Sequence, residues 1–229
     1  MEVSIEAPPP VSHDDPVPKN LFKIPFRLIL YGASSSGKTN VIRNLLSKRL
    51  PYHDIFGRNT FWFSETASLQ DSSLPPLRPE NLIQGFDTVK LQALWDEQNS
   101  IIAEFGKKRS PHILCVMDDT VCSFSDSKGS ILRRLFMTGR HSKISLICTS
   151  QSYKSIPKAV RCNASDAIFF EMNGKEVSAV CEEQSIKCDR FYDIFADATG
   201  EPYSFLTIHM NNHVSTRYQK RLTNSFYTV

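Results

Sequence analysis

Short runs of apolar residues recur along the chain and are separated by longer stretches with helical spacing. Each run is four to eight residues long, which favours strands that are buried on both faces. Strands are predicted at FRLILYG (26–32), NTFWFS (59–64), HILCVMDD (112–119), ISLICTSQ (144–151), AIFFEM (167–172) and YSFLTIHM (203–210).

Helices are predicted between these strands. The stretch 38–50 has apolar residues at positions 41, 42, 45, 46 and 50, the spacing of one helix face. Further helices are expected at 87–106, 128–141, 174–185 and 188–200, and the three prolines of 68–82 predict a loop there. Alternating strands and helices predict an α/β fold, with a mainly parallel sheet covered by helices on both faces.

The chain of 229 residues has the length of one α/β domain, which we place at 21–229. Residues 1–20 are acidic and rich in proline, which predicts a disordered leader rather than a secretory signal. No run of eighteen apolar residues occurs, so no membrane span is expected.

Composition and charge narrow the class of protein only slightly. Hydrophobic residues make up 41% of the chain and charged residues 22%, which is typical of soluble globular proteins. The net charge is +3, with basic clusters at 106–109, 133–134, 139–143 and 217–221 that either contact nucleic acid or form solvated faces. The six cysteines show no metal-ligand spacing, which favours reduced thiols over a disulfide or zinc site.

The sequence GASSSGKT (32–39) fits the phosphate-loop pattern G-x-x-x-x-G-K-[ST] and lies between a predicted strand and a predicted helix. Backbone N–H groups of such a loop surround the phosphates, the lysine neutralises them, and the threonine hydroxyl ligates Mg²⁺. The predicted nucleotide-binding residues are Gly32, Ala33, Ser34, Ser35, Ser36, Gly37, Lys38 and Thr39.

Two adjacent acids end the predicted strand at 112–119. A hydrophobic strand that delivers an acid to its carboxyl end supplies the second Mg²⁺ contact in this type of fold, which assigns that contact to Asp118. The next acid, Asp119, could polarise an attacking water, as hydrolysis requires. A plain Asp-Asp turn at the end of a strand is the alternative.

The predicted strand at 144–151 ends in polar residues. In P-loop ATPases whose motif strands neighbour one another, such a strand places a polar side chain near the γ-phosphate. Gln151, or Ser150 beside it, would then contact the attacking water or the phosphate. A solvated glutamine at a strand end is the simpler alternative.

Four sequence motifs occur in order: GASSSGKT, ILCVMDD, GRHSKISLICTSQ and VRCNASDAIFF. With them the chain resembles the FtsK–HerA superfamily, and within it the genome-packaging ATPases of poxviruses, other large DNA viruses, virophages and Polinton-type elements. The resemblance runs from about Leu21 to Met210, and FADATGEPYSFLTIH is similar to the closing segment of that family.

This resemblance implies an ATP-driven motor that forms a homo-oligomeric ring on double-stranded DNA and threads it into a preformed capsid. It implies ATP and Mg²⁺ as cofactors, a capsid or portal-like vertex protein as partner, no membrane, and a location inside the infected host cell. Asp118 would hold Mg²⁺, Asp119 would activate water and Gln151 would sense phosphate. Many members have glutamate where this chain has Asp119, so a shorter acid must reach the water by a different backbone placement.

Ring ATPases commonly complete each site with an arginine from the neighbouring subunit. The resemblance places an Arg-His pair at Arg140, which makes this residue the first candidate, with Arg161 as the second and a surface salt bridge as the alternative. Two other functions stay open on the sequence alone. One is a P-loop kinase for a small molecule, and the other is a nucleotide-binding switch with little turnover.

Overall fold

The computed structural model describes residues 20–66, 77–120, 129–184, 186–223 and 225–228, together with Ile5, Val17, Pro18 and Ser68. The predicted leader therefore lies almost wholly outside the described residues, as do Cys122 and most of the predicted loop at 68–82.

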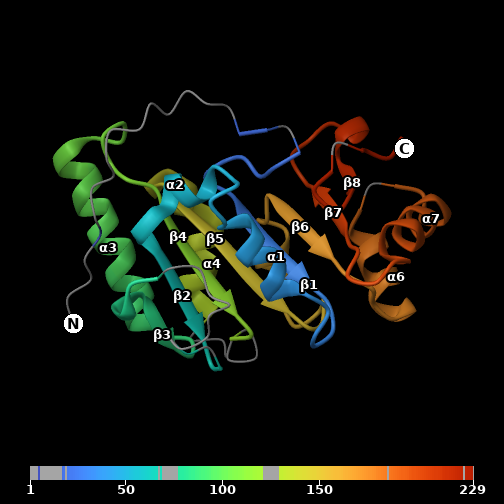
Figure 1. Cartoon of the computed structure of the whole chain (residues 1–229), viewed down its shortest axis with the longest axis horizontal. Coiled ribbons are helices and arrows are strands. Elements are labelled where there is room, and N and C mark those ends of the chain that lie inside the picture. The colour runs from blue at the N-terminus through green and yellow to red at the C-terminus, as the bar shows by residue number, and fades with distance from the viewer. Residues whose placement is uncertain are drawn as a thin grey trace.

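A single mixed sheet runs through the molecule (Figure 1). Its strand order is β3-β2-β4-β5-β1-β6-β7-β8, and pairing is parallel from β3 to β6 and antiparallel for β7 and β8. The strands are β1 (Arg27–Tyr31), β2 (Thr60–Ser64), β3 (Leu82–Gln84), β4 (Ile113–Asp118), β5 (Ile144–Ser150), β6 (Asp166–Phe169), β7 (Leu206–His209) and β8 (Tyr218–Lys220).

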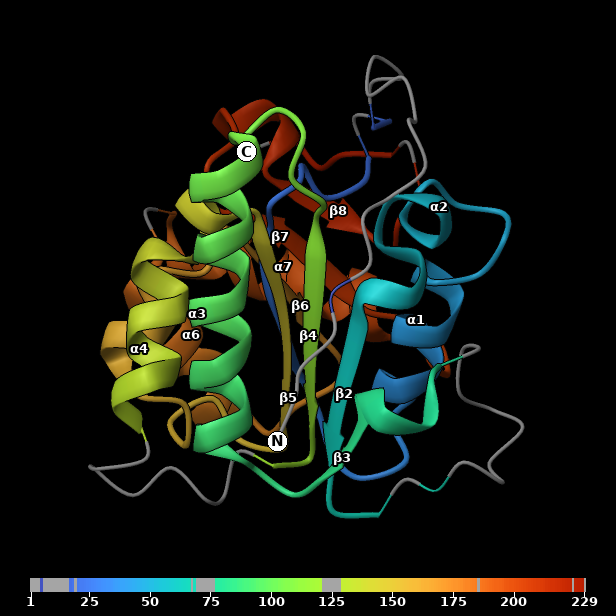
Figure 2. The same cartoon turned by 90° about the vertical axis from the view of Figure 1, so that its left-hand side faces the viewer.

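Helices cover both faces of the sheet (Figure 2). One face carries α1 (Lys38–Leu45) and α2 (Tyr52–Phe56). The other carries α3 (Thr88–Phe105), α4 (Gly129–Thr138), α5 (Lys158–Arg161), α6 (Gly174–Glu183) and α7 (Cys188–Thr199).

Two apolar clusters pack between these layers, one on each side of the sheet. Successive residues of β1 alternate between them, because neighbouring side chains of a strand point to opposite faces. Leu28 and Leu30 belong to the α1–α2 side, whereas Ile29 and Tyr31 belong to the other side. All four side chains are at most 1% exposed, so β1 is buried on both faces, as the apolar run predicts.

The α/β class, the mainly parallel sheet and the cover of helices on both faces are confirmed. The predicted loop at 68–82 is wrong at its end, because a 3₁₀ turn at Pro79–Asn81 leads into β3, which pairs with β2. The elements α2, α5 and β8 were not predicted. Each has only three to five residues, too few for a periodic apolar pattern to stand out.

The three strands that carry the predicted motifs lie side by side. β5 pairs with β1 on one side and with β4 on the other, all in parallel. The carboxyl ends of these strands, with the phosphate loop, the acid pair and Gln151, therefore meet at one edge of the sheet. We call it the carboxyl edge, and the opposite one the amino edge.

A buried tyrosine fastens the chain ahead of β1 to α2. The hydroxyl of Tyr52 accepts a hydrogen bond from the backbone N–H of Phe22 at 2.6 Å and donates one to its carbonyl at 2.7 Å. Both side chains are fully buried, so no water can replace these bonds.

Tyr52→Phe should lower the free energy of unfolding by about 1–3 kcal/mol, because it leaves two buried backbone groups without a partner. Denaturant titration would measure this as a shift of the midpoint. Tyr192→Phe makes the same chemical change at an exposed position and should alter stability by less than about 0.5 kcal/mol. Equal effects of the two substitutions would contradict this role for Tyr52.

Candidate active site

The phosphate loop connects β1 to α1 through a backbone that needs glycine at two places. A Cβ on Gly32 would lie 2.7 Å from Ser36 Oγ and 2.8 Å from Phe170 Cβ, so no larger residue fits there. Gly37, just before α1, has a φ of +104°, a region that side chains disfavour. Ser35 also has a positive φ, of 60°. The loop is therefore held in the bent form expected of a phosphate cradle.

Lys38 is folded back into the loop. Its ammonium donates hydrogen bonds to the carbonyls of Gly32 and Ala33, both at 2.8 Å. The side chain is buried, and burial lowers the pKa of the ammonium, although the charges of Asp119 and Asp118 oppose this shift. One positive charge is thus held at the base of the loop.

Asp118 ends β4 and is almost completely buried, with 7% of its surface exposed. One carboxylate oxygen accepts from the Thr39 hydroxyl at 3.1 Å, and the other accepts from the Thr149 hydroxyl at 3.0 Å. Burial raises the pKa of Asp118, whereas these two bonds act to lower it. Thr39 and Asp118, the two residues predicted to contact Mg²⁺, are thus in direct contact with each other. A hydroxyl beside a carboxylate is the oxygen ligand set that Mg²⁺ prefers, so these residues fit the ion.

Asp119 turns out of the sheet instead of continuing β4. Its φ is +52°, and its N–H donates to the Thr149 hydroxyl at 2.8 Å. The carboxylate is exposed and borders a hollow of 370 Å³. This hollow is lined by Ser35, Gly37, Lys38, Thr39, Asn40, Asp119 and Tyr203. The acid thus faces the same space as the phosphate loop.

Thr149 of β5 joins the two acids and was missed by the sequence reasoning. Its hydroxyl donates to the Asp118 carboxylate and accepts from the Asp119 backbone, and it is fully buried. The only signal in the sequence is a polar residue inside an apolar run, two positions before Gln151. A threonine at that place fits an ordinary strand equally well.

Gln151 follows β5 directly, at the carboxyl edge between β1 and β4, and is exposed. The alternative, Ser150, is occupied elsewhere, because its hydroxyl bonds Ser152 O at 2.8 Å and Ser155 Oγ at 2.7 Å. Glu176 of α6 holds the same turn through the Ser152 hydroxyl at 2.9 Å. These bonds fix the turn and leave Gln151 as the polar side chain that is exposed at the strand end.

The two candidate arginines lie in different surroundings. Arg140 is exposed and precedes β5, so it lies at the amino edge. With about 3.3 Å per strand residue, the length of β5 separates it from the phosphate loop of its own chain by about 20 Å. Arg161 forms an ion pair with Glu183 at 2.5 Å and donates to the Ile156 carbonyl at 2.6 Å.

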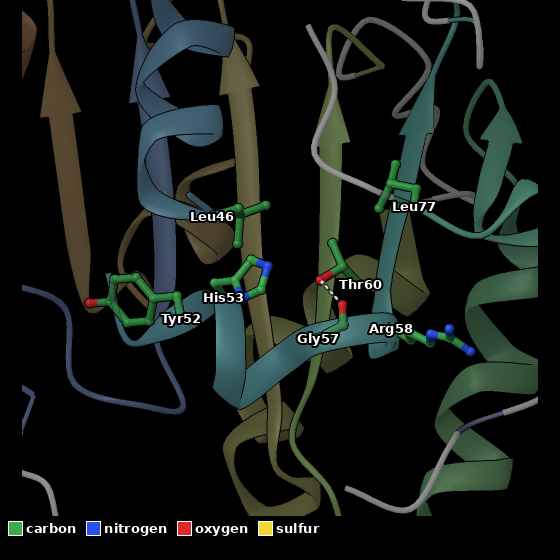
Figure 3. A pocket seen from close by; sticks show the side chains of 7 residues that line it. All are labelled: Leu46, Tyr52, His53, Gly57, Arg58, Thr60 and Leu77. Atoms are coloured by element: carbon green, nitrogen blue, oxygen red, sulfur yellow. Dashed lines mark hydrogen bonds between the residues drawn. The ribbon is translucent and has the colours of Figure 1, made fainter. Parts of the chain in front are cut away.

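A further hollow, of 240 Å³, lies at the other end of α1 from the phosphate loop (Figure 3). Its lining residues are Leu46, Tyr52, His53, Gly57, Arg58, Thr60 and Leu77. None of them is an acid or belongs to a predicted motif. Thr60 donates to the Gly57 carbonyl at 3.3 Å, which closes the turn that leads into β2. The hollow therefore adds nothing to the chemistry at the carboxyl edge.

The described residues contain neither a cluster of metal-ligating side chains nor a helix that could span a membrane. No cluster of three or more His, Cys, Asp or Glu side chains there could hold a metal ion. In the same part of the chain no helix combines the length and the apolar character that crossing a bilayer requires.

Solved structures with a similar fold include a viral packaging enzyme. The genome packaging NTPase B204 from Sulfolobus turreted icosahedral virus 2, in complex with AMP, superposes with a TM-score of 0.59 at 14% identity, over 87% of this chain and 98% of that one. EssC (ATPases 2 and 3) from Geobacillus thermodenitrificans gives a TM-score of 0.56 at 14% identity, over 81% of this chain and 38% of that one. At these identities the likeness establishes the fold, which is that of P-loop ATPases.

Sequence relatives lead to the poxviruses. The DNA packaging protein OPG160 of Variola virus is 24% identical over 175 residues, which are 75% of this chain and 63% of that protein. The chain thus spans less than two thirds of the length of this relative. The family described as Poxvirus A32 protein matches residues 17–220. That match covers most of the chain and confirms the resemblance predicted from the motifs, so the chain belongs to the Poxvirus A32 protein family.

Proposed function

We propose that this protein is an ATPase that moves double-stranded DNA and packages a viral genome into a preformed capsid. The observation that carries the proposal is the pair of hydrogen bonds that join Asp118 to Thr39 of the phosphate loop and to Thr149 of β5. These bonds bring together the phosphate loop, the acid pair and the strand that directly precedes Gln151. Two findings support DNA as the substrate that the ATPase moves. The chain belongs to the Poxvirus A32 protein family, and one of its relatives has the name DNA packaging protein.

Phosphates of ATP would lie on the backbone N–H groups of residues 32–39, at the N-terminus of α1, where the helix dipole favours anions. Lys38 would move its ammonium from two loop carbonyls to the β- and γ-phosphates. Thr39 and Asp118 would hold Mg²⁺, and the bound ion supplies positive charge next to the β- and γ-phosphates.

Asp119 is the proposed base, because its exposed carboxylate faces the hollow beside Lys38. Its positive φ gives this acid a backbone placement that a regular strand would not give, which fits the need of a side chain one methylene shorter than glutamate. Gln151, exposed at the end of β5, would hydrogen-bond the attacking water or the γ-phosphate.

DNA would be gripped through its phosphates, because a packaging motor must accept any sequence. Two basic clusters of the sequence meet at the amino edge, where a hollow of 370 Å³ is lined by Lys23, Arg27, Lys107, Arg140 and His141, among others. Burial lowers the pKa of Lys143, and the nearby charge of Lys107 adds to this shift.

Ring assembly would complete the site with Arg140 of a neighbouring subunit. Its separation from the phosphate loop of its own chain means that Arg140 can reach a nucleotide only across an interface. Within the described part of the chain it forms no ion pair and only a long hydrogen bond from its Nε to His141 at 3.4 Å, whereas Arg161 is bound to Glu183. We place the protein inside the infected host cell, with a capsid or portal-like vertex protein as its partner.

The overall test is the rate of phosphate release from ATP as protein concentration rises, with and without double-stranded DNA and with no phosphate acceptor. A rate that rises with concentration and with DNA is expected for a ring motor. ATP consumption only with an acceptor would favour a small-molecule kinase, and tight binding without turnover would favour a switch.

Substitutions at Lys38 and at Asp119 should affect ATP binding and ATP hydrolysis differently. Lys38→Ala removes the cation that faces the phosphates, so we expect weak ATP binding and no turnover. Asp119→Asn keeps the shape but loses basicity, so ATP binding should persist while hydrolysis falls roughly a hundredfold or more. Glu104→Gln, an acid-to-amide change on an exposed part of α3, should leave both unchanged. Hydrolysis by Asp119→Asn at the parental rate would remove Asp119 from the mechanism.

DNA affinity should fall steeply with salt and differ little between unrelated duplexes, because binding to phosphates releases counterions. Replacing both Lys107 and Lys108 by glutamine should make the negative slope of log affinity against log salt shallower, by roughly 0.9 for each phosphate that is no longer neutralised. Lys175→Gln, a single substitution at an exposed position of α6, should leave the slope unchanged. A strong preference for one short sequence at fixed salt would favour a gene regulator over a motor.

Arg140→Ala should bind ATP normally and hydrolyse it poorly. Mixing this variant with inactive Lys38→Ala subunits should restore part of the activity, because some interfaces then join an intact phosphate loop to an intact arginine. Phosphate release from mixtures of known ratio would measure the recovery. Arg161→Ala is the comparison, and loss of its ion pair should lower thermal stability without any rescue by mixing. Absence of recovery in rings shown to be mixed would argue against Arg140.

A further inference from the structure

An aromatic side chain stands in solvent beside the phosphate loop. Tyr203 lies in the connection between α7 and β7, and 72% of its surface is exposed, against 39% for Tyr192 on α7. Its Cδ1 lies 3.5 Å from the place that a Cβ on Gly37 would occupy, so the ring is next to the start of α1. The ring is therefore accessible to a ligand that enters the hollow beside the phosphate loop.

The backbone at Tyr203 is held in a conformation that its own side chain disfavours. Glu201, Pro202, Tyr203 and Ser204 form a turn closed by the Ser204 N–H to Glu201 carbonyl bond at 3.0 Å. Tyr203 is the third residue of this turn and has a φ of +59°. After a proline such a position is usually filled by glycine or asparagine. An aromatic residue persists in such a place only where its surroundings fix it, and such residues cluster at functional sites.

The surroundings do fix this turn. Arg221 donates to Glu201 Oε2 at 2.8 Å and to the Ser204 hydroxyl at 3.1 Å. Phe205, directly after the turn, packs against Phe170 with ring centroids 5.3 Å apart. Residues on both sides of Tyr203 in the sequence are therefore held in place, and they fix the position of its side chain.

Tyr203 also borders two hollows at once. One is the 370 Å³ hollow of Lys38, Thr39 and Asp119. The other, of 470 Å³, lies between residues 33–36 of the phosphate loop and residues 199–204. A ligand whose phosphates occupy the loop would thus extend past the ring of Tyr203 as it leaves the cradle.

We propose that the ring of Tyr203 stacks on the base of the nucleotide whose phosphates are held by Lys38 and Thr39. This inference rests on the proposed nucleotide binding and adds the place of the base. A ring face contacts the π-face that every base has, so the contact itself is tolerant of base identity. Tyr203 is thereby the residue that favours a nucleotide over a bare polyphosphate.

The test compares two ligands by titration calorimetry: Mg²⁺ with the β,γ-methylene analogue of ATP, and Mg²⁺ with tripolyphosphate. Tyr203→Gly is the main variant, because glycine accepts the positive φ and the turn should keep or gain stability. It should bind the analogue roughly tenfold more weakly than the parent, as expected when one stacking interaction is removed, and tripolyphosphate equally well. Tyr203→Phe keeps the ring and should match the parent for both ligands.

Unchanged affinity of Tyr203→Gly for the analogue would overturn the inference, and so would an equal loss for both ligands. Unchanged nucleotide binding together with impaired assembly of the oligomer would assign Tyr203 to a subunit interface instead. That result would also overturn the inference. Failure of the parent protein to bind the analogue, or full binding by Lys38→Ala, would refute the proposed nucleotide site itself. The two failures are therefore distinguishable.

Discussion

The carboxylate of Asp118, withdrawn from water and held by two threonine hydroxyls, organises this molecule. One hydroxyl comes from the first turn of α1 and the other from the neighbouring strand β5, so a single side chain ties three elements together. A buried charge is unfavourable unless it is hydrogen-bonded or paired with a cation. The two hydroxyls meet part of that requirement, and the raised pKa of Asp118 indicates that part of it remains. A cation beside Asp118, as proposed for Mg²⁺, would meet the remaining part.

The parallel sheet separates two kinds of chemistry. At the carboxyl edge lie the phosphate loop, both acids and Gln151, which are suited to a nucleotide. At the amino edge lie Lys23, Lys107 and Arg140, which are suited to an anionic partner or to a neighbouring subunit. Strands β1, β4 and β5 lie side by side and run from one edge to the other, so they connect the two regions directly. The proposed motor would need such a connection between its nucleotide and its DNA.

Most of the fold and the central site could be predicted because their signals are local. The phosphate loop is a motif of eight consecutive residues. The strand that ends in two acids can likewise be recognised from its own segment alone. Thr149 could not be found, because its role depends on which strand lies next to β4, and that pairing has no trace in β5 itself. Tyr203 was hidden for a similar reason, since some 165 residues separate it from Gly37. Short elements such as β3 and β8 exist through pairing with a neighbour and not through their own pattern.

The ammonium of Lys38 donates hydrogen bonds to the carbonyls of Gly32 and Ala33, so it is already engaged by the phosphate loop itself. Each bond from a charged donor is worth about 1.5–3 kcal/mol, so an arriving phosphate must offer the lysine more than the loop already does. The two loop carbonyls thus compete with an arriving phosphate for the ammonium of Lys38. The lysine should discriminate against weakly charged anions and yield only to a ligand that, like a triphosphate, presents several oxygens at once.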